Sequence, residues 1–165
     1  MFALLRRLLF LWLLMFWQGG FFFYSAVVVQ IGIALLGDAD QGLITQRVTN
    51  WLNLAGAVAL AAWAWDIAAE PSTPWLRRLR WWTWLSLAVM LVALAWLHIV
   101  MDGYMDPEAG RFDRHGFRVL HRWYLWISTV QWMGSVVLTW WTLRVWQATR
   151  EVSAKPPSEL HSTSV

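Results

Sequence analysis

Two histidines and one aspartate are the residues of this chain whose types and spacing suit metal binding. His98 and Asp102 are four residues apart, so they lie on one face of a helix, about 6 Å apart along its axis. His121 begins the next apolar segment, which runs back in the opposite direction. All three side chains would therefore meet at one end of a helix bundle, where imidazole and carboxylate suit zinc, copper(II) or non-haem iron.

Three interpretations of this cluster remain open. The residues could bind a metal ion, or His98 and His121 could ligate a haem from neighbouring helices. Alternatively, the histidines form structural hydrogen bonds with Asp102 and with arginines of the adjacent link. The cofactor therefore stays open between copper, zinc, haem and none. The sequence has no Walker, H-E-x-x-H or G-x-S-x-G pattern, so it favours a protein that is not an enzyme.

Four apolar stretches must position these residues, and they cover most of the 165-residue chain. They span residues 8–36, 51–69, 81–101 and 123–146, each near or above the ~20 residues that a transmembrane helix needs. Only 14% of the residues are charged, whereas a soluble domain has about 25%. We predict an all-α integral membrane four-helix bundle over residues 1–150, with the first stretch kept as an uncleaved span. Residues 151–165 are predicted to form a disordered cytoplasmic tail.

Polar side chains within these stretches should face the bundle interior, because exposing them to lipid is costly. This applies to Gln18, Gln30, Asn53, Ser128 and Gln131. The last stretch carries a polar stripe at steps of three and four residues, typical of one helical face: His121, Tyr124, Ser128, Gln131, Ser135, Thr139 and Thr142.

Small residues at two places predict close helix packing. One is the pair Gly19 and Gly20, and the other is the stripe Asn53, Ala57 and Ala61.

The charged residues predict an orientation and an ion pair. Asp66 lies one turn inside its span, and we expect it to pair with an arginine of the following link; a proton-relay role is the alternative. More Lys and Arg residues flank the ends that include both termini than flank the opposite ends, so both termini are predicted to be cytoplasmic. Several of the 16 tryptophans should anchor the spans at the headgroup level: Trp12, Trp51, Trp75, Trp81, Trp82, Trp123 and Trp146.

Two sequence segments resemble a known group of proteins. Residues 17–24 (WQGGFFFY), followed by three valines at 27–29, resemble the first span of small four-helix bacterial integral membrane proteins of uncharacterised function. Residues 120–125 (LHRWYL) and 129–132 (TVQW) are also similar to that group. The group is distantly similar to the membrane part of copper-resistance protein D. The resemblance implies a four-helix bundle and metal handling.

The sequence thus leaves several functions open for a small polytopic protein of the bacterial inner membrane. The first is metal binding at the outer end of the bundle, in transport or resistance. The second is an accessory or assembly subunit of a larger membrane complex, and the third is haem binding. The expected partners are the lipid bilayer and either another membrane protein or a second copy of the chain. Nucleic acid is not expected, because the basic residues sit at helix ends, where anionic headgroups attract them.

Overall fold

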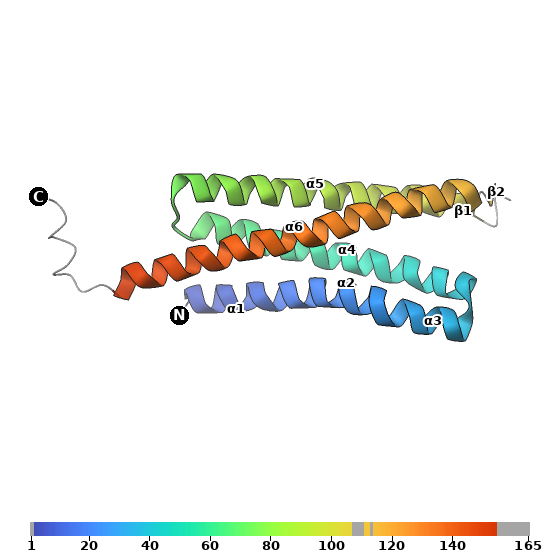
Figure 1. Ribbon diagram of the computed structural model, residues 1–165, viewed down its shortest axis with the longest axis horizontal. Coiled ribbons are helices and arrows are strands. Elements are labelled where there is room, and N and C mark those ends of the chain that lie inside the picture. Colours follow the sequence, from blue (N-terminus) through green and yellow to red (C-terminus); the bar gives the residue numbers. More distant parts are fainter. Residues whose placement is uncertain (1, 107–110, 113, 155–165) are drawn as a thin grey trace, which may run out of the picture.

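Four long helical rods form the described part of the chain in the computed structural model, which covers residues 2–106, 111–112 and 114–154 (Figure 1). The first rod comprises α1 (Phe2–Leu14), the π-helix η1 (Met15–Gly19), α2 (Gly20–Phe23), the π-helix η2 (Tyr24–Val28) and α3 (Val29–Leu36). The other rods are α4 (Asp38–Ala69), α5 (Pro74–Tyr104) and α6 (Arg114–Ala154). Two short strands, β1 (Met105–Asp106) and β2 (Arg111–Phe112), pair antiparallel between α5 and α6. The predicted all-α bundle is confirmed.

Three of the rods are long and apolar enough to cross a membrane: Phe2–Leu36, Asp40–Ala69 and Pro74–Tyr104. Helix α6 is longer, at 41 residues, but it is not among them. Its residues 123–146 are rich in tryptophan, serine and threonine, which lowers the mean hydropathy. The predicted fourth span therefore stays a prediction.

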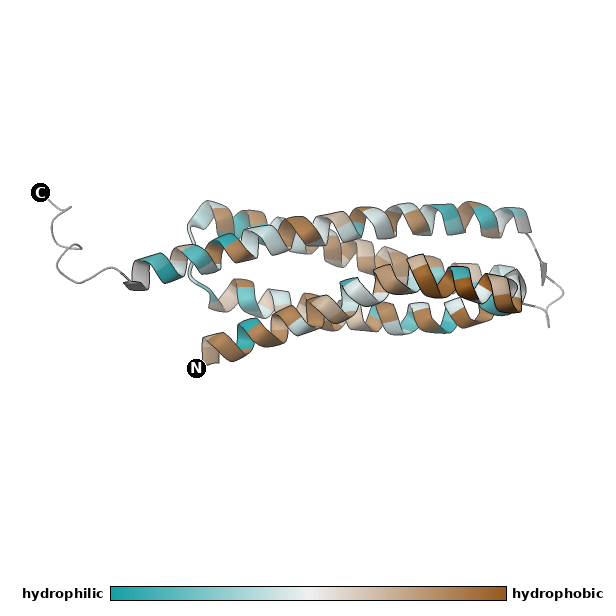
Figure 2. Ribbon diagram, turned by 60° about the horizontal axis from the view of Figure 1, so that its bottom comes forward, coloured by the Kyte–Doolittle hydropathy of each residue, from teal (hydrophilic) through white to brown (hydrophobic). Residues whose placement is uncertain are grey.

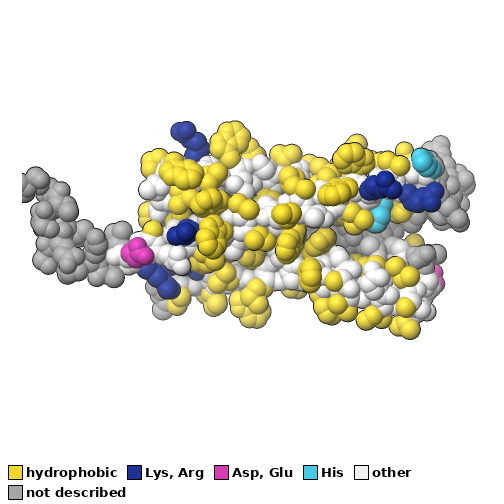
Figure 3. All heavy atoms as spheres, viewed as in Figure 1, with side chains coloured by type: hydrophobic (Ala, Val, Ile, Leu, Met, Phe, Trp, Pro, Cys, Tyr) yellow, Lys and Arg dark blue, Asp and Glu magenta, His cyan; other side chains and the backbone are white. Residues whose placement is uncertain are grey.

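Apolar side chains cover the middle of the bundle, and charged ones gather toward its two ends (Figure 3). Hydrophobic residues recur along the rods (Figure 2). The start of α1, the end of α4, the start of α5 and the end of α6 lie together at one end (Figure 1). We call this the Asp66 end, and the opposite end the His98 end. Both ends of the described chain thus lie on the same side of the bundle.

Two links between rods are short, and each contains a residue that interrupts a helix. Gly37, with φ of 84°, separates α3 from α4 and takes a conformation that other residues adopt only with strain. Residues 70–73 separate α4 from α5, and Pro74 begins α5. Helix α6 continues through residues 151–154, so the predicted disordered tail is wrong for those four residues. Residues 155–165 lie outside the described part.

Aromatic side chains from three rods fill the core at the Asp66 end. Phe10 of α1 lies edge-on to Trp63 of α4, with ring centroids 5.0 Å apart. It also lies edge-on to Trp146 of α6, at 5.5 Å. Trp146 is therefore a core residue and not the headgroup anchor that its position near a span end predicted.

The first rod and α4 approach closely at two glycines, Gly32 beneath the side chain of Gln41 and Gly56 beneath Trp17. A Cβ atom at Gly56 would lie 2.8 Å from the indole of Trp17. Gly19, by contrast, faces open space, and Gly20 makes only an ordinary contact. Ala57 and Ala61 are exposed. The prediction that Gly19, Gly20, Ala57 and Ala61 form the close helix contact is therefore wrong. The indole of Trp17 packs instead over Gly56, the residue before Ala57.

Two π-helical turns interrupt the first rod and change which residues face the bundle. Each π turn holds an extra residue, so the residues after it are rotated relative to a regular α-helix. Gln30, in α3 after both turns, is exposed. The prediction that Gln30 lies in the bundle interior is wrong; it rested on the polarity of the side chain, which does not determine the face that α3 turns to the bundle.

Candidate functional site

A buried imidazole lies beside a half-exposed carboxylate at the His98 end. His98 Nε2 is 4.0 Å from Asp102 Oδ1, and the two side chains are 7% and 40% exposed. Gln46 of α4 donates a hydrogen bond from Nε2 to Asp102 Oδ1, at 2.7 Å. The i, i+4 spacing on α5 brings the pair together, as the sequence predicts, and α4 fixes the carboxylate from the other side.

The His98 imidazole is incompletely satisfied in this arrangement. Its Nε2 atom is buried and has no hydrogen-bond partner among the described residues. A buried polar nitrogen without a partner is costly, and such atoms often mark a place where a ligand, ion or water belongs. The carboxylate of Asp102 beside it is half-exposed.

His121 stands apart from this pair. Its side chain is exposed and stacks on the ring of Phe117, with centroids 5.7 Å apart. Within the described part of the chain, no three His, Asp or Glu side chains are grouped closely enough to hold a metal ion. The structure therefore brings together His98 and Asp102, and it does not add His121 as a third ligand.

The polar stripe of α6 faces the bundle, as predicted. Ser128, Gln131, Ser135 and Thr142 are buried. Gln131 donates a hydrogen bond from Nε2 to the carbonyl oxygen of Leu87, at 3.2 Å. The interior placement of Ser128 and Gln131 is confirmed, and the exposed His121 is the exception.

The other predicted interior residues are only partly buried. Asn53 is half-buried and lies near the hydroxyl group of Tyr124. Gln18 is also half-buried, in the first π turn.

The Asp66 end contains a second polar site, an ion network that joins α1, α4 and α5. Asp66 and Arg80 are both fully buried, and Arg80 Nη2 donates to Asp66 Oδ2 at 2.7 Å. Arg6 Nε donates to the other carboxylate oxygen of Asp66 at 3.1 Å. The predicted ion pair of Asp66 with an arginine of the following link is confirmed by Arg80.

Further contacts extend this network to a second acid and to α6. Glu70 pairs with Arg6 Nη2, and with Arg7 Nη2 at 2.6 Å. Trp146 of α6 donates from Nε1 to both oxygens of Asp66, at 3.3 Å each. The network therefore ties together the ends of all four rods, and its geometry is that of a structural clamp.

Sequence reasoning missed Arg6, Arg7 and Glu70 as members of this network. One signal was available, because Glu70 follows Asp66 by four residues and so shares its helical face. The two arginines lie more than 60 residues before Glu70, and only the packing of α1 against α4 brings them together.

Comparison with protein-family models, curated proteins and solved structures finds no match to this chain. The site must therefore be interpreted from its own chemistry. Both sites leave buried nitrogens without hydrogen-bond partners among the described residues: Arg7 Nε, Arg80 Nε and Arg80 Nη1 in the ion network, and Nε2 of His98. The two arginines already pair with carboxylates through another nitrogen, and an arginine is not a metal ligand, whereas the imidazole of His98 can bind a cation. The His98 end is consequently the better candidate for ligand binding.

Proposed function

We propose that this protein is a non-catalytic component of a bacterial inner membrane, with both termini cytoplasmic, and that it binds a metal cation through His98 and Asp102 at the outer end of the bundle. The observation that carries the proposal is the buried, unpartnered Nε2 of His98, 4.0 Å from Asp102 Oδ1. Two metal–ligand bonds of about 2.0–2.2 Å at a tetrahedral angle place the ligand atoms about 3.3–3.6 Å apart, so the two side chains need to approach by only about 0.5 Å to bind one ion.

The chemistry of the pair favours a borderline metal ion such as zinc or copper(II), which bind imidazole and carboxylate ligands. Two protein ligands leave the remaining positions of the ion to water. Such a site binds weakly and exchanges readily, which suits transport or resistance better than a permanent structural role. Gln46 supports it by orienting the Asp102 carboxylate, as groups next to metal ligands commonly do.

The proposal predicts that zinc binding depends on His98 and not on His121. In equilibrium dialysis of the purified protein against zinc, His98→Gln and Asp102→Asn should each weaken binding by about tenfold or more, because each removes one of two ligands. His121→Gln is the matched control, since His121 is exposed and stacked on Phe117. Unchanged zinc binding by His98→Gln would refute the proposal. A Soret band lost in either histidine variant would instead support haem ligation.

A second candidate function is an accessory subunit of a larger membrane complex. The exposed apolar surface of the first rod favours it. Only 6% of an apolar 18-residue stretch of this rod is buried inside the bundle, compared with 33% for the corresponding stretches of α4 and α5. Large side chains point outward along its length, among them Trp12, Phe16 and Phe23. This surface would contact lipid in a lone protein and a neighbouring helix in a complex.

The accessory-subunit proposal predicts position-dependent crosslinking in the native membrane. A photo-crosslinking amino acid at Phe16 or Phe23 should give one discrete protein adduct, because these exposed positions lie on the rod with the least internal packing. The same amino acid at Val92, which is exposed on α5, is the control and should give none. Absence of an adduct at all three positions, or the same adduct at all three, would count against a specific partner surface on the first rod.

A further inference from the structure

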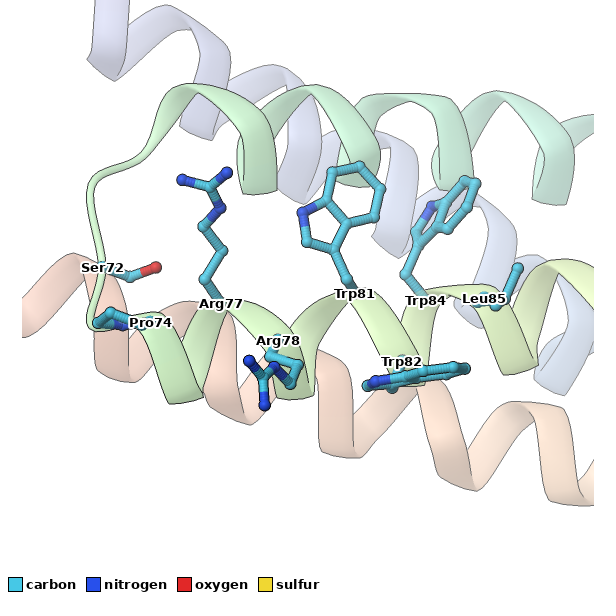
Figure 4. Close-up of a pocket in the computed structure, with 8 residues that line it drawn as sticks. All are labelled: Ser72, Pro74, Arg77, Arg78, Trp81, Trp82, Trp84 and Leu85. Carbon is cyan, nitrogen blue, oxygen red and sulfur yellow. The ribbon is translucent and has the colours of Figure 1, made fainter.

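A pocket of about 560 Å³ lies beside the start of α5, at the Asp66 end of the bundle (Figure 4). Its polar side is lined by Ser72, Arg77 and Arg78. Its apolar side is lined by Trp81, Trp82 and Leu85, which follow along α5 toward the middle of the bundle. The lining therefore changes from cationic to apolar over the seven-residue step from Arg78 to Leu85, about 10 Å of helix.

The cationic side of the pocket is not neutralised by the protein. The nearby acids Asp66 and Glu70 are taken up by Arg6, Arg7 and Arg80. Within the described ranges, neither Arg77 nor Arg78 forms an ion pair, and the buried hydroxyl of Ser72 has no hydrogen-bond partner. Two guanidinium groups and one hydroxyl are thus available to an anionic group with several acceptor oxygens.

Two tryptophans of the apolar side, Trp81 and Trp84, are held in place by contacts within the bundle. Trp84 donates a hydrogen bond from Nε1 to the carbonyl oxygen of Leu60 on α4, at 2.8 Å. Trp81 lies edge-on to Trp84, with ring centroids 5.4 Å apart, so its position is set by the same contact. Trp82 is 63% exposed on the outer surface of α5. Tryptophan side chains near the end of a membrane-spanning helix commonly lie at the boundary between headgroups and acyl chains.

We infer that this pocket binds the headgroup of one anionic phospholipid. Arg77 and Arg78, which leave α5 on different sides in Figure 4, bind the phosphate from two directions together with Ser72, and the glycerol and upper acyl chains lie along Trp81, Trp82 and Leu85. A zwitterionic lipid offers the same phosphate but brings its own cation, which two unpaired arginines repel. Inorganic phosphate shares the anionic chemistry but gains nothing from the apolar side. The pocket should therefore select a lipid with a net negative charge.

The test is lipid retention by the full-length protein, measured by native mass spectrometry in a neutral detergent with equimolar phosphatidylglycerol and phosphatidylcholine. The wild type should retain one phosphatidylglycerol molecule in preference to phosphatidylcholine. Arg77→Gln/Arg78→Gln should reduce that retention by about tenfold or more, because it removes both charged hydrogen-bond donors of the pocket. Excess inorganic phosphate should not displace the lipid.

The matched control is Arg144→Gln/Arg150→Gln, which removes the same charge at the same end of the bundle but from α6, outside the pocket. This control should keep the preference for phosphatidylglycerol. An equal loss in both double variants would assign the preference to net charge and overturn the inference. Equal retention of the two lipids by the wild type, or displacement of the lipid by phosphate, would also overturn it.

Discussion

Replacing Asp66 with asparagine should lower the free energy of unfolding by about 3–5 kcal/mol, the usual cost of removing one partner from a buried ion pair. The carboxylate lies fully buried between Arg80 and Arg6, and it also accepts hydrogen bonds from Trp146. Its removal leaves the fully buried Arg80 guanidinium without a carboxylate partner. The measurement is chemical unfolding of the purified protein in detergent, followed by tryptophan fluorescence.

The double variant Asp66→Asn/Arg80→Gln distinguishes a charge effect from lost packing. Removing both members of the pair should be less damaging than removing Asp66 alone, because no buried charge is then left unpaired. A double variant as unstable as the sum of the two single variants would contradict this account. Glu70→Gln should cost less than Asp66→Asn, since the ion pairs of Glu70 are with two α1 arginines that are partly exposed.

Replacing Gly56 with alanine should lower the free energy of unfolding by about 1–3 kcal/mol, the opposite sign from a normal glycine-to-alanine change in a helix. The added methyl group would lie 2.8 Å from the indole of Trp17. Trp17 is itself buried, in contact with the aromatic core, so it cannot move aside freely. The same unfolding experiment in detergent measures the change.

Gly42 provides the matched control, because it lies in the same helix and a Cβ atom there would meet nothing within 4 Å. Gly42→Ala should stabilise the protein by up to about 1 kcal/mol through helix propensity. Trp17→Leu should relieve the cost of Gly56→Ala when the two are combined. A destabilisation of equal size at Gly42 and Gly56 would show that close packing on Trp17 is not the cause.

The helices and the inward polar face of α6 are predictable from the sequence, because both follow from local periodicity. Apolar stretches of sufficient length predict the rods, and steps of three and four residues place Ser128 and Gln131 on the buried face. The proximity of His98 and Asp102 follows from the same rule, since four residues complete about one turn.

Features that depend on packing between distant segments are not predictable in this way. The π turns shift the face of α3 and leave no signal in hydropathy, so the polarity of Gln30 alone misplaces it. The clustering of Arg6 and Arg7 with Glu70 requires the register of α1 against α4. Trp146 has the sequence position of a headgroup anchor, and that position does not reveal the buried carboxylate opposite it.

The ion network also has a consequence for the order of events during synthesis. Arg6 leaves the ribosome 60 residues before the Asp66 carboxylate that it contacts in the folded protein. Until α4 is made, the guanidinium groups of the nascent first rod have neither acid available, so water or phospholipid headgroups must solvate them. This rod can therefore form its ion pairs only after α4, the second hydrophobic segment, has been made.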